Sequence, residues 1–376
     1  MPHVTFSYVH PTPCTSVCIG GMFNQWEPEK MTPTEAGWTL SVELEEGLHP
    51  YKYHVDGEWV HDPTMPSYTD TEGPINNYVR VLPDSPPLDL TPVPLPPLDD
   101  TLPYGYEEDG VLTHRVKRHG FQFSGDRDYQ TLNEGYVMPY IQRRMAEMYQ
   151  VVPLCFPGDT MSTLRPAYVS EGLMGHRGRV LVLIPGSGLV EAGIWGRALC
   201  CNDSLQTGSM LPYLAQAERE GYKVVVMNPN RRHRYDLDHT LAVWRHLVLG
   251  SAASEIYVVA HSYGGIAVAH ILSETVKERE GDAPAESGMC VNPRLTAVAL
   301  TDSVHGGSRY LHGAALEWLG EVAVQYRTSP NPVDTLECAL GDSMEGCEVR
   351  SAGVMDHAST NEAAREAIFN RFRQKW

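Results

Sequence analysis

The stretch from Ile256 to Gly265 places the strongest constraint on how this chain can fold. Its first half, up to Ala260, is a short β-branched and apolar run, which is typical of a strand buried on both faces of a parallel sheet. Ser262 follows at once, and a helix-like segment comes after it. A serine on such a strand–turn–helix junction is exposed at the strand's carboxyl end, as in the G-x-S-x-G nucleophile elbow. The pattern indicates a candidate nucleophile, although a serine that only caps the helix leaves the same pattern.

Apolar strand-like runs alternate with helix-like segments from residue 179 onward. The strand-like runs are 180–184, 223–227, 256–260, 295–300 and 348–351, and the helix-like segments are 211–220, 239–249 and 361–375. This alternation predicts a doubly wound, mainly parallel sheet. In such sheets, functional residues collect at the carboxyl ends of the strands.

Three polar side chains follow three of these strands: Ser262, Asp302 and His357. Neighbouring strands lie about 4.8 Å apart, so three consecutive strand ends lie within roughly 10 Å of one another. The chain order serine, aspartate, histidine is that of α/β-hydrolases. The sequence therefore predicts a catalytic triad in which His357 accepts the proton of Ser262 and Asp302 orients the imidazole.

Other residues compete for these roles. His305, three residues beyond Asp302, is a second candidate base, and Asp334 or Asp356 could supply the acid. His261 lies beside the nucleophile and is expected to hold the loop through its ring nitrogens.

The predicted oxyanion hole is made of backbone N–H groups. Tyr263 supplies one and Ser187, in the glycine-rich loop 185–188, supplies the other. Ala260 stands in place of the first glycine of the elbow pattern, and Gly264 keeps the second position small.

Residues 4–82 have the pattern of a small all-β domain. Short alternating runs are separated by turn residues, and Asp56-Gly57 is a strong hairpin signal. The hairpin brings Trp59 close to its tip, and Trp26 lies in a second tip-like segment. Such tryptophans can stack on the apolar faces of sugar rings, but without further evidence the pattern favours both as core residues of a sandwich. Trp38, within a strand-like run, is assigned to the core.

This region resembles the glycogen-binding module of AMP-activated kinase β subunits, the family 48 carbohydrate-binding module. The resemblance rests on segments in the same order at residues 20–26, 47–59, 61–63 and 73–77. It implies an immunoglobulin-like sandwich that contacts α-1,4-glucan through Trp26, Lys52, Trp59 and Asn76. Glu72 stands where the family has an apolar residue against the sugar, a departure that bears on affinity and not on fold. The alternative is a module that serves only for protein docking.

Residues 83–103 contain prolines at a density that forbids helix and ladder pairing, which predicts a semi-rigid polyproline spacer. We therefore divide the chain into a carbohydrate-binding module at residues 1–82, a proline-rich linker at 83–103 and an α/β domain at 104–376.

The α/β domain resembles the Argonaute-binding, or Arb-type, family. The shared motifs lie at residues 185–188, 192–195, 228–230, 259–265, 297–305 and 351–353, followed by His357. The resemblance implies an α/β-hydrolase-like fold in which Ser262 is the nucleophile and Asp302 and His357 are its partners. It also implies protein partners in small-RNA and chromatin silencing or in co-transcriptional regulation. Pro185 replaces the histidine of the family's H-G-S-G loop, which removes a polar contact behind the oxyanion loop.

Composition limits the partners. The formal net charge of −18 repels nucleic acid phosphates, so we expect no direct binding to nucleic acid. No 18-residue apolar run and no apolar segment after Met1 occur, so we expect neither a membrane span nor a secretory signal. The eight cysteines form no C-x-x-C pair, which favours a reduced intracellular compartment, cytoplasmic or nuclear, and no metal site. We expect no cofactor.

Two functions from different classes remain open. The first is an intracellular serine esterase or acyl hydrolase that its N-terminal module brings to glycogen or another α-glucan, with a glucan-modifying deacylase as a variant. The second is a non-catalytic scaffold of an Argonaute small-RNA, heterochromatin or co-transcriptional complex. Any link to RNA would then run through a protein partner.

Overall fold

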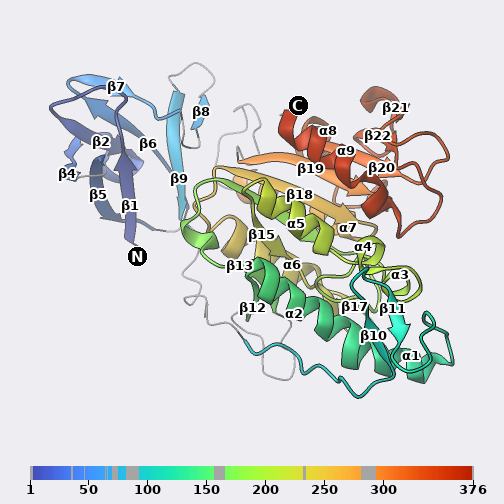
Figure 1. Ribbon diagram of the computed structural model, residues 1–376. Helices are drawn as coiled ribbons and strands as arrows, with labels where there is room; N and C mark the ends of the chain where they lie inside the picture. Colours follow the sequence, from blue (N-terminus) through green and yellow to red (C-terminus); the bar gives the residue numbers. More distant parts are fainter. Residues whose placement is uncertain are drawn as a thin grey trace. The chain divides into compact units, whose positions relative to one another are not determined.

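The computed structural model describes residues 3–34, 37–45, 47–63, 65, 67–69, 75–81, 93–155, 166–231, 234–280 and 294–374. The chain divides into two compact units, one built mainly from its first 87 residues and the other mainly from residue 88 onward (Figure 1).

The N-terminal unit consists of two antiparallel sheets. One has the strand order β1-β5-β4, and the other has the order β3-β2-β6-β9-β8 with β7 added to β6. The strands are β1 (His3–Tyr8), β2 (Val17–Gly21), β3 (Glu29–Lys30), β4 (Thr32–Thr34), β5 (Gly37–Glu43), β6 (Gly47–Val55), β7 (Glu58–Val60), β8 (Ser67–Thr69) and β9 (Ile75–Val81).

Aromatic side chains join the two sheets of this unit. Phe6 of β1 contacts Tyr51 of β6 with ring centroids 4.8 Å apart, and Tyr8 stacks on Tyr53 at 4.2 Å. Such ring pairs add about 0.5–1.5 kcal/mol each beyond the apolar area that they bury. Trp38 packs against the same cluster, as expected. The unit is thus an all-β module with a core between two sheets, while its immunoglobulin-like class stays a prediction.

The described part of the proline-rich segment lies against the C-terminal unit. The Val93 N–H donates to the carbonyl of Pro153 at 3.0 Å, and the Asp99 N–H donates to the carbonyl of Gly135 at 2.8 Å. Leucines at positions 95, 98 and 102 pack against the core of that unit. Residues 83–92 of the predicted linker lie outside the described residues.

The C-terminal unit is built on a nine-stranded sheet with the order β12-β13-β15-β14-β18-β19-β20-β22-β21. Its strands are β12 (Val151–Leu154), β13 (Ala167–Ser170), β14 (Arg179–Ile184), β15 (Lys223–Val226), β18 (Glu255–His261), β19 (Leu295–Thr301), β20 (Ala323–Arg327), β21 (Leu336–Cys338) and β22 (Glu348–Ser351). The pairs from β15 through β14, β18, β19 and β20 to β22 are parallel, and the flanking strands are antiparallel. The predicted doubly wound, mainly parallel sheet is confirmed.

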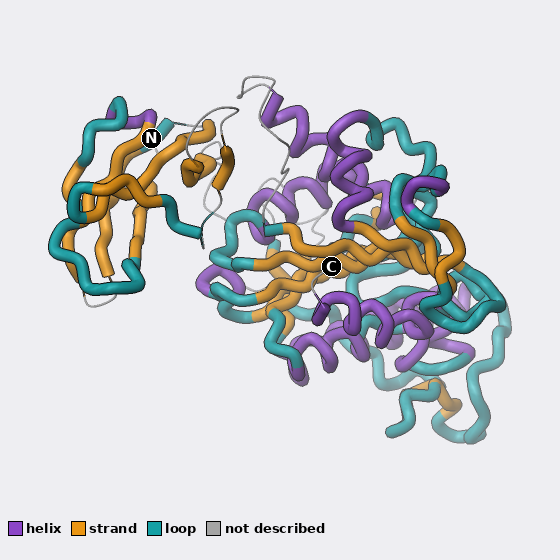
Figure 2. The backbone as a smooth tube through the Cα atoms, turned by 90° about the horizontal axis from the view of Figure 1, so that it is seen from above, coloured by secondary structure: helices purple, strands orange, loops and turns teal. Residues whose placement is uncertain are grey.

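Helices cover both faces of this sheet (Figure 2). They are α1 (Asp126–Leu132), α2 (Met138–Tyr149), α3 (Arg197–Asn202), α4 (Leu205–Gly208), α5 (Leu211–Arg219), α6 (Leu237–Val243), α7 (Gly264–Glu280), α8 (Gly313–Val322) and α9 (Thr360–Gln374). The described elements also include two small hairpins, β10 (Tyr104–Tyr106) with β11 (Leu112–His114) and β16 (Asn230–Arg231) with β17 (Arg234–Tyr235).

One face of the sheet is packed by α2, α5 and α9. Phe369 of α9 is fully buried in the same cluster as Leu183 of β14 and Val259 of β18. The alternate strand residues, such as Val182 and Val258, are also fully buried and point to the opposite face. Burial on both faces explains why these strands are continuous apolar runs in the sequence.

The register of β18 and β19 places the end of one strand beside the end of the other. Ala260 pairs with Leu300, and His261 pairs with Thr301. The residues that follow, Ser262 and Asp302, therefore leave the sheet side by side at its carboxyl edge.

Candidate active site at the carboxyl edge of the sheet

Ser262 occupies a strained turn between β18 and α7. Its φ is 52°, in the left-handed region that only glycine adopts without cost. The turn is held by backbone hydrogen bonds: the Ser262 N–H donates to the carbonyl of Thr301 at 3.0 Å, and the Val304 N–H donates to the Ser262 carbonyl at 3.2 Å. This is the strand-to-helix geometry that exposes a nucleophile at the top of a sheet.

Small residues let the backbones approach at this turn. A Cβ on Gly264 would lie 2.7 Å from the carbonyl oxygen of Ile184, and a Cβ on Gly186 would lie 3.0 Å from the Cβ of Ser262. The glycine-rich loop after β14 therefore lies directly against the candidate nucleophile.

Asp302 and His357 are joined by a hydrogen bond of 2.6 Å between Oδ2 and Nδ1. The second oxygen of Asp302 accepts from the backbone N–H of Thr328 at 3.1 Å and from its hydroxyl at 3.3 Å. Because Nδ1 of His357 donates to the carboxylate, Nε2 carries the lone pair that a general base needs.

The Ser262 hydroxyl and the His357 imidazole are neighbours that are not hydrogen-bonded to each other within the described part of the chain. The His357 imidazole packs against the ring of His261, the residue before Ser262, with 4.6 Å between the two ring centroids. Nucleophile–base hydrogen bonds are commonly long in unliganded sites and tighten with substrate. The structure thus brings Asp302 and His357 together and places both next to the serine turn.

A buried hydrogen-bonded chain links the three loops behind these side chains. His261 donates from Nδ1 to the carbonyl of Thr301 at 2.9 Å, and the Thr301 hydroxyl donates to Oδ1 of Asn361 at 2.7 Å. Asn361 in turn donates from Nδ2 to the carbonyl of Ala358 at 3.1 Å. The chain members His261, Thr301 and Ala358 each adjoin one predicted triad residue in sequence, so this chain fixes the spacing of the triad.

His261 has a structural role, as expected. Burial and the nearby His357 lower the pKa of His261 to about 4, so the ring is neutral at physiological pH. A neutral ring that donates from Nδ1 leaves its Nε2 as an acceptor only.

His305, the competing candidate base, has both ring nitrogens hydrogen-bonded to other groups. It is fully buried, with Nδ1 bonded to the Ser303 hydroxyl at 2.9 Å and Nε2 bonded to the Glu345 carbonyl at 3.0 Å. Burial lowers the pKa of His305 to about 4, which also makes it a poor base at neutral pH.

Asp334 and Asp356, the competing candidate acids, are also hydrogen-bonded to other groups. Asp334 accepts from the Tyr326 hydroxyl at 3.1 Å and lies 3.4 Å from the Arg350 guanidinium. Asp356 accepts from the backbone N–H of Ser359 at 2.9 Å and from its hydroxyl at 2.6 Å, and the hydroxyl bond lowers the pKa of Asp356. Of the three aspartates, Asp302 alone has a described hydrogen bond to His357.

Two residues that the sequence did not single out hold the predicted oxyanion loop. Asn230 accepts from the Gly188 N–H at 3.0 Å and donates to the Gly186 carbonyl at 2.8 Å. The Tyr235 hydroxyl donates to the carbonyl of Pro185 at 2.9 Å. Asn230 belongs to a motif that carries the family resemblance, which was the one available signal for its role.

The N–H groups predicted for the oxyanion hole, those of Ser187 and Tyr263, have no hydrogen-bond partner among the residues that the structure describes. The Tyr263 ring packs against the Tyr235 ring with centroids 4.9 Å apart, so the turn and the loop support each other.

Three of the four residues predicted to bind glucan, Lys52, Trp59 and Asn76, lie on one sheet of the N-terminal unit, and Trp26 lies in the turn between β2 and β3. Tyr51 of β6 pairs with Asn77 of β9, and His54 pairs with Trp59 of β7. Because side chains alternate along a strand, Lys52 and His54 share the face opposite to the core residue Tyr51.

Asn76 precedes Asn77, so continuing the register places it across from Lys52 with its side chain on the same side of the sheet, where it is 8% exposed. Trp59 is 42% exposed, and its ring lies 6.2 Å from the Trp26 ring at 72°. Trp26 itself has a φ of 64°, which is unusual for a bulky residue. Glu72, the departure from the family pattern, lies outside the described residues.

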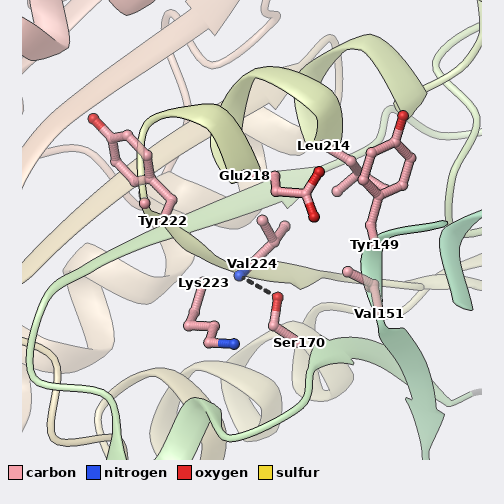
Figure 3. A pocket seen from close by; sticks show the side chains of 9 residues that line it. Tyr149, Val151, Ser170, Leu214, Glu218, Tyr222, Lys223 and Val224 are labelled. Carbon is pink, nitrogen blue, oxygen red and sulfur yellow. Dashed lines mark hydrogen bonds between the residues drawn. The ribbon is translucent and has the colours of Figure 1, made fainter.

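A cavity of about 190 Å³ lies away from the candidate site. It is lined by Tyr149, Val151, Ser170, Leu214, Glu218, Gly221, Tyr222, Lys223 and Val224 (Figure 3). Lys223 and Val151 begin their strands, so the cavity lies at the amino end of β15 and β12, and Ser170 there accepts the Val224 N–H at 2.8 Å. It contains none of the predicted site residues.

The described residues contain no group of three or more histidine, cysteine, aspartate or glutamate residues placed to hold a metal ion. They also contain no helix that is long and apolar enough to cross a membrane.

Residues 3–86 match the family model described as the glycogen recognition site of AMP-activated protein kinase, and residues 117–237 match the Arb2 domain model. The human protein named Cotranscriptional regulator ARB2A is 28% identical over 355 residues, which cover 74% of this chain and 81% of that protein. The rat 5'-AMP-activated protein kinase subunit beta-1 is 38% identical over 65 residues, which cover 17% of this chain and 24% of that protein.

A FAM172 family protein homolog of Caenorhabditis elegans is 34% identical over 214 residues, covering 54% of this chain and 64% of that protein. Among solved structures, the enterobactin esterase FES of Shigella flexneri is 12% identical with a TM-score of 0.32, covering 100% of this chain and 94% of that one. An esterase of Pyrobaculum calidifontis is 14% identical with a TM-score of 0.36, covering 66% of this chain and 93% of that one.

Two buried histidines make the stability of the fold depend on pH. The pKa values of His261 and His305, both about 4, lie below the value of about 6.5 for an unfolded histidine. Between these values the unfolded chain binds more protons, so the free energy of unfolding falls as the pH drops from about 6.5 to about 4, by about 3 kcal/mol per histidine at most.

We expect His305→Asn to make this fall shallower in denaturant unfolding measured from pH 7 to pH 4. The matched control is His312→Asn, at an exposed position, which should keep the wild-type slope. A slope that His305→Asn leaves unchanged would contradict the assignment of His305 as a buried neutral residue.

Proposed function

We propose that this chain, a glycogen-recognition module of the AMP-activated protein kinase type joined to an Arb2 domain, is a serine hydrolase of carboxylic esters. The observation that carries the proposal is the 2.6 Å hydrogen bond between His357 Nδ1 and Asp302 Oδ2, beside the left-handed turn at Ser262. Its domains are the module at residues 1–82, the linker at 83–103 and an α/β-hydrolase-like domain at 104–376.

In the proposed reaction, Ser262 Oγ attacks the ester carbonyl carbon while His357 Nε2 takes the hydroxyl proton. The N–H groups of Ser187 and Tyr263 hold the oxyanion of the tetrahedral intermediate. The protonated imidazole then gives its proton to the leaving alcohol, and an acyl-enzyme remains. Water then gives a proton to His357 Nε2 and attacks the acyl carbon. The bond from that carbon to Ser262 Oγ breaks, the imidazolium returns the proton to Oγ, and the acid leaves. Asp302 stays ionised and stabilises the imidazolium in both half-reactions.

The proline of the oxyanion loop fits this proposal. The family pattern has a histidine at position 185, and Pro185 offers no polar side chain. Here the Pro185 carbonyl accepts from Tyr235, and Asn230 bonds to both glycines of the loop. These two residues supply the polar anchors that fix the loop behind the oxyanion.

The N-terminal module, as an immunoglobulin-like sandwich, would bring the hydrolase to glycogen or a related α-glucan. The support is the shared outer face of Lys52, Trp59 and Asn76, with the ring of Trp26 next to that of Trp59. An exposed indole offers the flat apolar surface on which a sugar ring stacks. Ester groups carried by the glucan itself are one substrate that this arrangement would serve.

A second candidate is a non-catalytic scaffold of a co-transcriptional or Argonaute-containing silencing complex, located in the nucleus or the cytoplasm. It is favoured by the name of the relatives, Cotranscriptional regulator ARB2A, and by the missing hydrogen bond between Ser262 and His357 in the described structure. Under this reading the site is a remnant, and the C-terminal domain docks proteins.

The hydrolase is tested with a fluorophosphonate probe on the purified chain. Ser262 should become labelled, Ser262→Ala should abolish labelling, and Asp302→Asn should slow it by about 10³–10⁴-fold because the imidazole loses its orientation. Ser254→Ala is the matched control, since Ser254 precedes the same strand at its opposite end. Absence of labelling in the wild type, or labelling that persists in Ser262→Ala, would favour the scaffold.

Glucan binding is tested by retention on amylose resin. The wild type should be retained, and Trp59→Ala should elute with the unbound protein because the stacking surface is lost. Val9→Ala, at another exposed apolar position of the same unit, should behave as the wild type. A wild type that is not retained, or a Trp59→Ala variant that is retained equally well, would rule out this use of the module.

A further inference from the structure

Every loop that contributes to the candidate site also carries an exposed large apolar side chain. Each of these side chains lies one or two positions from a predicted site residue: Leu189 from Ser187, Tyr263 from Ser262, Val304 from Asp302 and Met355 from His357. Their exposed fractions are 47%, 36%, 54% and 69%. We call these four residues the apolar rim.

The four loops converge on Ser262. The Val304 N–H bonds to the Ser262 carbonyl at 3.2 Å, and Tyr263 adjoins the serine. A Cβ on Gly186, in the loop that leads to Leu189, would lie 3.0 Å from the Ser262 Cβ.

The loop of Met355 reaches the same place through His357. The His357 ring lies 4.6 Å from that of His261, the residue before the nucleophile. Each rim residue therefore lies on a segment that adjoins or contacts the serine turn, and for the segment of Met355 the contact is made by the His357 ring.

Single exposed apolar residues are common on protein surfaces and need no explanation. The rim differs because its members occur together on four separate loops, each within two positions of a residue of one chemical site. Tyr263 is also fixed in place, since its ring packs on the ring of Tyr235. Such a collection around a nucleophile suits a substrate whose reacting carbonyl is attached to an apolar group.

We propose that Leu189, Tyr263, Val304 and Met355 form the acyl-binding surface of the site. The preferred substrates are then esters of uncharged acyl groups several methylenes long, and acetate esters are poor substrates. When the ester carbonyl carbon lies at Ser262 Oγ, the acyl chain packs against the apolar rim and is removed from water. This inference rests on the proposed function and adds the class of substrate to it.

The test compares p-nitrophenyl acetate with p-nitrophenyl octanoate on the full chain. Each fully buried methylene contributes about a fourfold gain, so even partial burial of the chain should raise kcat/KM for octanoate over acetate by at least about 10-fold. The double variant Val304→Thr/Met355→Gln keeps the side-chain sizes and makes two of the four rim residues polar. Its octanoate-to-acetate ratio should fall towards one.

Met344→Gln is the matched control, because Met344 is 96% exposed and belongs to none of the four loops. This variant should keep the wild-type ratio. Thermal unfolding of all variants should match the wild type, since every substituted side chain is largely exposed.

The outcomes separate this inference from the function on which it rests. Labelling of Ser262 together with a wild-type ratio near one, or a ratio that the double variant leaves unchanged, overturns the acyl surface and leaves the hydrolase standing. Failure of both labelling and ester hydrolysis overturns the hydrolase and the acyl surface together. An unchanged ratio combined with loss of a co-purifying protein from the double variant would reassign the rim to a protein partner.

Discussion

The parallel register between β18 and β19 is the constraint on which the candidate site depends. It sets His261 opposite Thr301, so that Ser262 and Asp302 emerge next to each other at the carboxyl edge. From there a buried chain of hydrogen bonds continues through Thr301 and Asn361 to the loop of His357. A slip of this register by one residue would turn every side chain of a strand to the opposite face and would separate the carboxylate from the serine.

Two of the described non-glycine residues with a positive φ lie at the same edge. Ser262 and Asp302 have φ values of 52° and 41°, and non-glycine residues in this region cost about 1–3 kcal/mol each. The cost is offset where the fold fixes both residues: Thr301 accepts from the Ser262 N–H at 3.0 Å, and Tyr326 accepts from the Asp302 N–H at 2.7 Å. Residues in this backbone region cluster at active sites in proteins generally, and the two here are the predicted nucleophile and its predicted acid.

The sequence predicted the parts of the fold that local pattern controls. The apolar run 180–184 became β14, and the segment 361–375 became α9 with a shift of one residue. The sequence did not predict β20, because the buried Gln325 interrupts its apolar run, and it did not predict β12, because Pro153 interrupts that strand. At the site, chain order alone could not show that His357 bonds to Asp302 while His305 bonds to Ser303 and Glu345, because these contacts depend on side-chain direction. It also could not reveal Asn230 and Tyr235 as anchors, because their contacts join distant segments.

We propose that Ser262, His357 and Asp302 act as one unit with the backbone N–H groups of Ser187 and Tyr263. A crystal structure of the chain with an alkyl boronic acid, which mimics the tetrahedral intermediate, tests this arrangement directly. We expect a bond from boron to Ser262 Oγ, one boronate oxygen hydrogen-bonded to both N–H groups, and His357 Nε2 within hydrogen-bonding distance of the adduct. A boronate that leaves Ser262 unmodified, or an adduct with the imidazole turned away from it, would show that these groups do not act together.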